Sequence, residues 1–323
     1  MLRRTVALLA VLALLAACGG GTTPSVAGPG PTSGAMPTFT AGPTEALSGT
    51  PVPTIPPTRF DGQVTLADGG WLLARCTGTG SPTILLEAGG TEGNMQEWGG
   101  TFPLLLATHA TVCRYSRRGG EGSSTAPVPL TWETMLADAN ALLSTVRTKA
   151  GIAGPYVFVG WSFGGEVALG EAVAHRAETK GLVILDTDFP RDFMTQCLAA
   201  GHSKADCQAE FDGDREAKAI EVDLVKTIVP IPEIPMVLVS AIRPGPDCLV
   251  EPGASGVSYG MSGQEITAPD CDTLFQKIAD ADVADWGTIG TVTQTRVDAD
   301  HNGLIREAGS QIAELILQLI GGS

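Results

Sequence analysis

Short apolar runs alternate with amphipathic stretches along the chain from about residue 60 onward. Residues 131–148 place their apolar side chains on one helical face, with Thr131 in position to cap the N-terminus. The last helix is predicted from the same spacing of Leu304, Ala308 and Ile312. The runs predicted to be strands are Gln63–Leu66, Trp71–Cys76, Thr83–Glu87, Thr111–Tyr115, Tyr156–Trp161, Leu182–Asp186, Met236–Ala241 and Val292–Val297.

This alternation predicts an α/β fold, in which a mostly parallel, doubly wound sheet of about eight strands has helices on both faces. Residues 187–235 interrupt this alternation of strands and helices, because they form the longest gap between predicted strands. They carry two cysteines and a charged helical stretch, 212–226. We interpret 187–235 as an inserted lid over one end of the sheet; the alternative is a plain surface excursion.

The N-terminus has the pattern of an export signal. Arg3 and Arg4 precede an almost wholly apolar stretch, residues 6–17, which is shorter than the ~20 residues that a membrane-spanning helix needs. The stretch ends in Leu-Ala-Ala followed by Cys18, which resembles the bacterial lipobox, where the signal is cut before a cysteine that then receives lipid. We therefore predict that residues 1–18 form a lipoprotein signal with Cys18 as the lipidated residue; the alternative is an ordinary secretory signal.

Residues 19–59 are rich in Pro, Gly, Thr and Ser, and almost all of them are uncharged. Such a segment buries too little apolar surface to offset the entropy of ordering it. We predict a disordered linker there, which connects a membrane-attached lipid anchor outside the cytoplasm to a folded domain at 60–323.

Composition excludes several functional classes. The chain has 20 Lys and Arg against 35 Asp and Glu, a formal net charge of −15, which argues against nucleic-acid binding because that needs a basic surface. Its cysteines lack CxxC spacing and no HExxH sequence occurs, so we expect no zinc site. We expect neither a metal nor another cofactor, and we expect a monomer.

The candidate nucleophile is Ser162, which lies in a G-x-S-x-G sequence between a predicted strand and a helical stretch. A serine on such a strand-to-helix turn has a strained backbone and an exposed hydroxyl. Glycines two residues before and after it leave room where strand and helix crowd together. Ser258 also lies in a G-x-S-x-G sequence, but nothing strand-like precedes it.

With these motifs, the chain from about residue 60 resembles the α/β-hydrolase superfamily, and most closely its secreted or lipid-anchored bacterial esterases and lipases. Residues 85–91 sit where that family has a His-Gly turn after its third strand, and residues 114–124 resemble its Y-D-R-x-G-x-G-x-S loop. Two positions depart from the family: Ala88 replaces the usual His and Ser116 the usual Asp.

The resemblance implies a catalytic base near the C-terminus. His301 lies just after the last predicted strand and before the terminal helix, where the family carries its catalytic His. The other histidines, His109, His175 and His202, are expected to be structural or to face solvent.

The resemblance places the acid after the strand at 236–241, and Asp247 is our candidate there. Asp186, at the end of the preceding strand, is the alternative, and Asp270 and Asp272 fit less well. The oxyanion hole is expected from the backbone N–H groups of Phe163 and Gly90, with Thr91 as an alternative to Gly90.

Six cysteines remain besides Cys18. In the family the second and fourth strands are neighbours, which implies a disulfide between Cys76 and Cys113. We expect two further disulfides, one between Cys197 and Cys207 and one between Cys248 and Cys271. The alternative is free buried thiols, which export disfavours.

These features together predict an extracytoplasmic serine hydrolase that cleaves small-molecule or lipid carboxylic esters through an acyl-enzyme. One alternative is a non-catalytic binding lipoprotein on a hydrolase scaffold, because fold alone does not dictate function. Another keeps the same triad but uses it for peptidase, acyl-transfer or perhydrolysis chemistry.

Overall fold

The computed structural model describes residues 55–190, 194, 197–198, 203–213, 215–245, 248, 258–259, 265–266 and 268–321. Within them an eight-stranded sheet has the order β1-β2-β4-β3-β5-β6-β7-β10, which confirms the predicted fold class. Its strands are β1 (Thr58–Thr65), β2 (Trp71–Thr77), β3 (Thr83–Glu87), β4 (Thr111–Ser116), β5 (Tyr156–Trp161), β6 (Thr179–Leu185), β7 (Met236–Ala241) and β10 (Val292–Val297).

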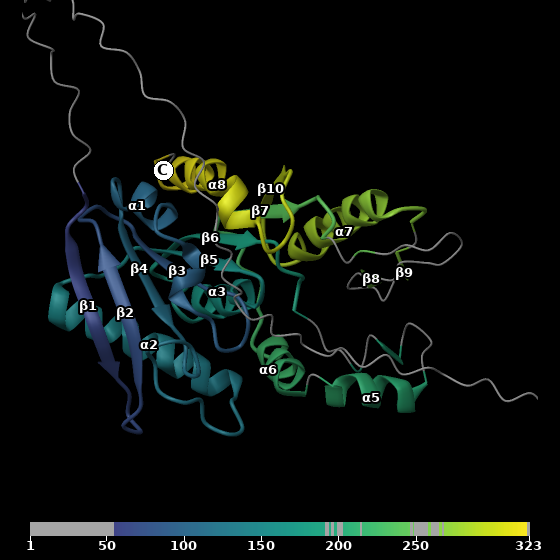
Figure 1. Ribbon diagram of the computed structural model, residues 1–323, viewed down its shortest axis with the longest axis horizontal. Helices are drawn as coiled ribbons and strands as arrows, with labels where there is room; N and C mark the ends of the chain where they lie inside the picture. The colour runs from purple at the N-terminus through teal and green to yellow at the C-terminus, as the bar shows by residue number, and fades with distance from the viewer. Residues whose placement is uncertain are drawn as a thin grey trace, which may run out of the picture. The chain divides into compact units, whose positions relative to one another are not determined.

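The helices lie between and after these strands (Figure 1). They are η1 (Met95–Trp98), α1 (Phe102–Ala107), α2 (Trp132–Ala150), α3 (Phe163–Ala174), α5 (Lys204–Gly213), α6 (Arg215–Val225), α7 (Cys271–Trp286) and α8 (Leu304–Gly321). A second, two-stranded sheet consists of β8 (Ser258–Tyr259) and β9 (Glu265–Ile266).

The sheet is mostly parallel, and only the β1–β2 and β2–β4 pairs are antiparallel. Strand β1 begins at Thr58, before the start predicted at Gln63 and just inside the predicted linker. It is an edge strand with one partner, and its exposed positions are polar. A half-exposed polar edge strand lacks the apolar run on which the prediction depended.

The side chains of the central strands pack alternately into two separate hydrophobic cores, because successive side chains of a strand point to opposite faces of the sheet. Leu85 of β3 packs with α2, α3 and Trp286 of α7, whereas Ile84 and Leu86 pack on the other face with α1 and α8. Figure 1 shows α1 and α8 on one side of the sheet and α2 and α3 on the other. The predicted double winding is confirmed.

Local sequence signals set several helix ends. Thr131 caps α2 as predicted, because its Oγ1 accepts the Thr134 N–H at 3.2 Å. In the predicted lid segment, α6 packs Ile220 and Leu224 against Trp132 of α2 in a small third core. That the segment acts as a lid stays a prediction. Helix α7 was not predicted.

Three disulfides join the expected cysteine pairs. Cys76 and Cys113 are opposite each other in the β2–β4 register, and their Cα atoms are 4.1 Å apart. The other two bonds join residues 197 to 207 and 248 to 271. The alternative of free thiols is therefore not what the structure shows for these six cysteines.

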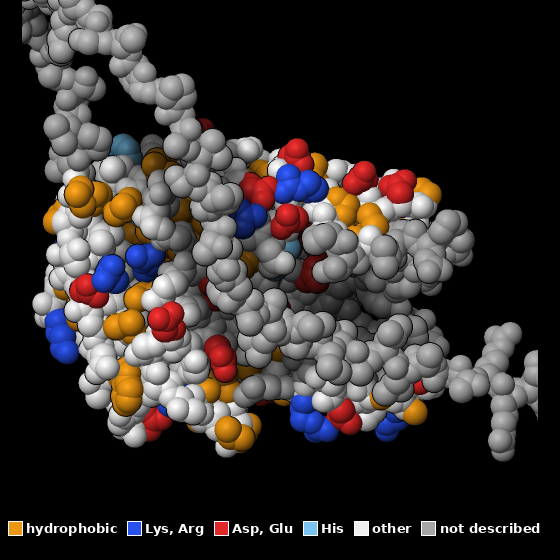
Figure 2. Space-filling view, in the orientation of Figure 1, with side chains coloured by type: hydrophobic (Ala, Val, Ile, Leu, Met, Phe, Trp, Pro, Cys, Tyr) orange, Lys and Arg blue, Asp and Glu red, His pale blue; other side chains and the backbone are white. Residues whose placement is uncertain are grey.

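Charge is mixed over the visible surface of the described residues. On the face shown in Figure 2, Lys and Arg side chains lie among acidic ones. Among the ion pairs of the described residues, Arg243 contacts the carboxylates of Asp300 and Glu307. Among the residues described, none of the helices combines the length and apolar character needed to cross a membrane. The predicted signal, Cys18 and the linker up to residue 54 lie outside the described residues.

Buried carboxyl groups lie on the strand ends and on α3. Glu87 and Glu171 are fully buried, and burial raises the pKa of both. Neither oxygen of Glu171 has a hydrogen-bond partner among the described residues, and its Oε2 lies 3.5 Å from His175 Nε2. A carboxyl group in such surroundings favours the protonated form.

We predict that Glu171→Gln weakens the pH dependence of stability. Folded Glu171 binds its proton to a higher pH than the ~4.3 of an unfolded Glu, so its contribution is complete below that value and is lost as pH rises. Urea unfolding at pH 5 and pH 8 measures this, with exposed Glu133→Gln as control. Wild type and the Glu133 variant should lose more stability over this range than Glu171→Gln; equal losses in all three contradict the prediction.

Candidate active site

Ser162 lies on the sharp turn between β5 and α3, as predicted. Its backbone has φ 54° and ψ −136°, a conformation that is rare for a residue with a side chain and that is found at functional turns. Ser162 directly precedes the first turn of α3. The first N–H groups of a helix lack acceptors within that helix, and they carry a partial positive charge.

Two glycines make this turn possible. A Cβ atom on Gly160 would lie 2.0 Å from the carbonyl oxygen of Gly164. A Cβ atom on Gly164 would lie 2.0 Å from the carbonyl oxygen of Glu87, at the end of β3. The crowding expected from the sequence is therefore confirmed at both positions. The turn is also tied to β6, because Thr187 Oγ1 donates to the Ser162 carbonyl at 2.7 Å.

His301 lies between β10 and α8, with Nδ1 2.7 Å from Asp186 Oδ2. A carboxylate only accepts hydrogen bonds, so Nδ1 is the donor and Nε2 keeps its lone pair when the ring is neutral. Asp186 is itself held, because its Oδ1 accepts the Ala241 N–H at 2.8 Å. The His301 ring also packs on Trp161, with 5.4 Å between ring centroids.

Asp186 thus occupies the position beside the imidazole that we predicted first for Asp247. Asp247 lies outside the described residues. Asp186 directly follows β6, the neighbour of β5, and it too has a positive φ, 48°. The signal for Asp186 in the sequence was its place at the end of a buried strand adjacent to the strand that leads to Ser162.

The electrostatic surroundings favour a charged imidazole. The hydrogen bond to Asp186 raises the pKa of His301 above its ordinary value, against the opposing effect of burial. The nearby carboxylates of Asp188 and Asp300 act in the same direction. Such a ring readily accepts a proton and stays oriented by its carboxylate partner.

Ser162 and His301 open into one cavity of about 450 Å³. Its other walls come from the turn after β3, from η1, from the end of β5 and from the loop between β10 and α8. They are Gly89, Gly90, Thr91, Glu92, Gly93, Glu97, Trp161 and Asn302. The cavity therefore collects the predicted nucleophile, the predicted base and the predicted oxyanion residue Gly90. Phe163 does not line this cavity, but its N–H begins α3.

Two of the other histidines lie away from this site, as predicted. His109 is exposed, and His175 Nε2 pairs with Asn140 Oδ1 at 2.7 Å in a different part of the fold. His202 lies outside the described residues. Among the residues that the structure describes, no group of three or more His, Cys, Asp or Glu could hold a metal ion.

Comparison with known proteins supports the fold. Residues 82–227 match the family model described as alpha/beta hydrolase fold. Among solved structures, ALR0039, a putative alpha/beta hydrolase from Nostoc sp PCC 7120, is 15% identical with a TM-score of 0.54, over 81% of this chain and 97% of that chain. A hydrolase from Pseudomonas aeruginosa PA01 is 16% identical with a TM-score of 0.51, over 81% and 98%.

Epoxide hydrolase VrEH1 from Vigna radiata is similar to the same extent, with 14% identity and a TM-score of 0.51 over 82% of this chain and 98% of that chain. No curated protein matches the sequence. At these identities, the structural likeness concerns the fold. The chain has the α/β-hydrolase fold, as its resemblance to that family implied.

We predict that Asp186→Asn lowers the pKa of His301. An amide does not stabilise the imidazolium as a carboxylate does, so the cause that contributes most to the raised pKa disappears. NMR titration of the His301 ring measures the pKa directly, without any assumption about activity. Asp247→Asn is the second variant and should leave the pKa at the wild-type value. A lower pKa in Asp247→Asn, with no change in Asp186→Asn, contradicts the assignment.

Proposed function

We propose that this protein is a serine hydrolase that cleaves carboxylic esters, with Ser162, His301 and Asp186 as its triad. One observation carries the proposal: Ser162, strained on its turn, shares a cavity with the His301 imidazole, whose Nδ1 is hydrogen-bonded to the Asp186 carboxylate. A serine hydroxyl needs such a base to become nucleophilic at neutral pH. The α/β-hydrolase fold supports the proposal by analogy.

In the acylation step, Ser162 Oγ attacks the ester carbonyl carbon while its proton passes to His301 Nε2. Asp186 stabilises the resulting imidazolium through the Nδ1–H hydrogen bond. The tetrahedral intermediate collapses when its bond to the leaving oxygen breaks. His301 gives its proton to that oxygen, which leaves as the alcohol, and the acyl group stays on Ser162.

Deacylation repeats the sequence with water. His301 takes a proton from the water molecule as its oxygen attacks the acyl carbon, and then returns the proton to Ser162 Oγ as the acid leaves. The developing oxyanion of each step is stabilised by the N–H of Phe163 and by an N–H of the turn after β3. No step needs a group outside the chain, the substrate and water.

We predict that Ser162→Ala abolishes both ester hydrolysis and labelling by a fluorophosphonate probe. Loss of the nucleophile removes the acyl-enzyme, so turnover of p-nitrophenyl butyrate should fall by ~10³-fold or more. The matched control is Ser258→Ala, which alters the serine of the second G-x-S-x-G sequence and should keep wild-type rates.

The outcomes separate the alternatives. Full turnover in Ser162→Ala contradicts the proposal. A wild-type protein that the probe does not label is a binding protein on a hydrolase scaffold. A protein that the probe labels but that does not hydrolyse esters would be a peptidase. Product analysis with added alcohols or hydrogen peroxide distinguishes acyl transfer and perhydrolysis from hydrolysis.

We also propose that the enzyme works outside the cytoplasm on a lipid anchor at Cys18. The support is the charged and apolar pattern of residues 1–17, the small residues before Cys18 and the uncharged linker that follows. Three disulfides agree with an oxidising compartment. A diacyl anchor contributes ~0.8 kcal/mol for each buried CH₂ group, which is enough for stable attachment.

We predict that Cys18→Ser changes the location of the protein in a bacterial host. Wild-type protein should incorporate labelled palmitate and sediment with membranes, whereas the variant should incorporate none. Cys248→Ser controls for loss of a cysteine and should still be labelled. Equal labelling of wild type and Cys18→Ser would rule out the proposed lipid attachment.

A further inference from the structure

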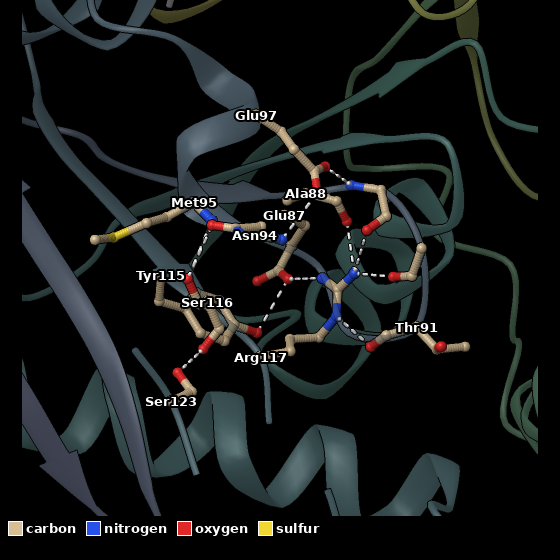
Figure 3. A network of polar contacts seen from close by, with 12 residues as sticks. Glu87, Ala88, Thr91, Asn94, Met95, Glu97, Tyr115, Ser116, Arg117 and Ser123 are labelled. Carbon is tan, nitrogen blue, oxygen red and sulfur yellow. Dashed lines mark hydrogen bonds and ion pairs between the residues drawn. The ribbon is translucent and has the colours of Figure 1, made fainter. Parts of the chain in front are cut away.

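One buried arginine is bound to the whole turn that forms the cavity wall after β3. The Arg117 side chain is 6% exposed, and its guanidinium reaches four successive carbonyl oxygens (Figure 3). Nη2 donates to Ala88 O at 2.6 Å and to Gly89 O at 3.2 Å, and it also contacts Gly90 O. Nε donates to Thr91 O at 3.1 Å.

This arrangement determines where the N–H groups of the turn point. In a planar trans peptide the C=O and the N–H point in opposite directions. Carbonyls 89 and 90 face Arg117, so the N–H groups of Gly90 and Thr91 point away from it. Both residues line the cavity with Ser162, and neither N–H has an acceptor within the described part of the chain.

The guanidinium is itself fixed on its other sides. Nη1 donates to Glu87 Oε2 at 3.0 Å, and the Tyr115 hydroxyl donates to the same oxygen at 3.0 Å. The guanidinium carbon also lies 5.9 Å from the centre of the Phe163 ring. Arg117 therefore contacts the residues that carry both expected oxyanion donors, Phe163 on α3 and Gly90 on the turn.

A second carboxylate, that of Glu97, holds an N–H group of the same turn. Glu97 Oε2 accepts the Gly89 N–H at 3.1 Å, and Glu97 Oε1 accepts the Asn94 N–H at 3.1 Å (Figure 3). The Gly89 N–H is thereby occupied and is not available to a substrate. The N–H groups of Gly90 and Thr91, which follow it along the turn, remain available to a substrate in the cavity.

We infer that Arg117 is a positioning residue for the oxyanion hole: it turns the carbonyls of residues 88–91 inward, so that the N–H groups of Gly90 and Thr91 face the substrate oxygen. The inference rests on the proposed hydrolase function, because it assigns a role in that reaction. It concerns a residue that touches neither the substrate nor the triad. Its effect passes through the backbone that Arg117 holds.

The test compares Arg117→Lys with Arg118→Lys in the full chain. An ammonium group keeps the charge but cannot reproduce the planar set of donors that reaches four carbonyls. Arg118 is a matched control, because its side chain is 8% exposed and pairs with Asp138 at 2.6 Å. Its hydrogen bonds go to Asp138 and Asp68 and not to the turn, although it is the next residue along the chain.

The readout is the ratio of kcat/KM for a p-nitrophenyl ester to that for its thionoester, in which sulfur replaces the carbonyl oxygen. Sulfur is a weak hydrogen-bond acceptor, so an aligned oxyanion hole favours the ester. We expect Arg117→Lys to lower kcat on the ester by ~10²-fold and the ratio by about tenfold. Arg118→Lys should keep the wild-type ratio.

The ratio separates positioning from a general loss of folded enzyme, because unfolding lowers both rates equally. An unchanged ratio in folded Arg117→Lys overturns the inference, while a wild type without esterase activity overturns the proposed function instead. If Arg117→Lys does not fold, Glu87→Gln replaces it. That variant weakens the contact that orients the guanidinium, so its ratio should fall by a smaller factor, and an unchanged ratio there also overturns the inference.

Discussion

The contact of the first turn of α3 with the end of β3 is the constraint on which the site depends. Gly164 lies so close to the Glu87 carbonyl that no side chain fits between them. This contact fixes the position of Ser162 relative to the turn that begins at Ala88. Interior packing tolerates few voids and little strain, so one backbone contact places the nucleophile and the cavity wall together. The ends of β5 and β6, held by Thr187, complete the frame.

Features encoded in short stretches of sequence could be predicted. The strands of the sheet, the Thr131 cap and the turn at Ser162 all follow from neighbouring residues, and the structure confirms them. The prediction of His301 depended on the resemblance to the α/β-hydrolase family, which carries its catalytic His between the last strand and the terminal helix. The disulfide between Cys76 and Cys113 followed from the strand order that the family resemblance implied, since the neighbouring strands β2 and β4 bring the two cysteines into register.

Features that depend on contacts between distant residues could not be predicted from short stretches of sequence. Whether Asp186 or Asp247 faces His301 depends on how three strand ends meet, and no local pattern states this. Arg117 was recognised only as part of a loop motif, because its contacts with residues 88–91 arise from the β3–β4 pairing. Helix α7 was not predicted, because Asp282 and Asp285 interrupt the apolar pattern along its buried face. Both aspartates are nevertheless buried in the structure.

The partner of His301 comes from β6, not from the long stretch of chain between β7 and α7. That stretch is tied at its far end by the disulfide between residues 248 and 271. Evolution can therefore lengthen, shorten or replace its middle without moving the carboxylate that the imidazole needs. In this protein the carboxylate that orients the base lies on a separate part of the chain, and an engineer who wants new substrate preferences can vary the stretch between β7 and α7 without touching it.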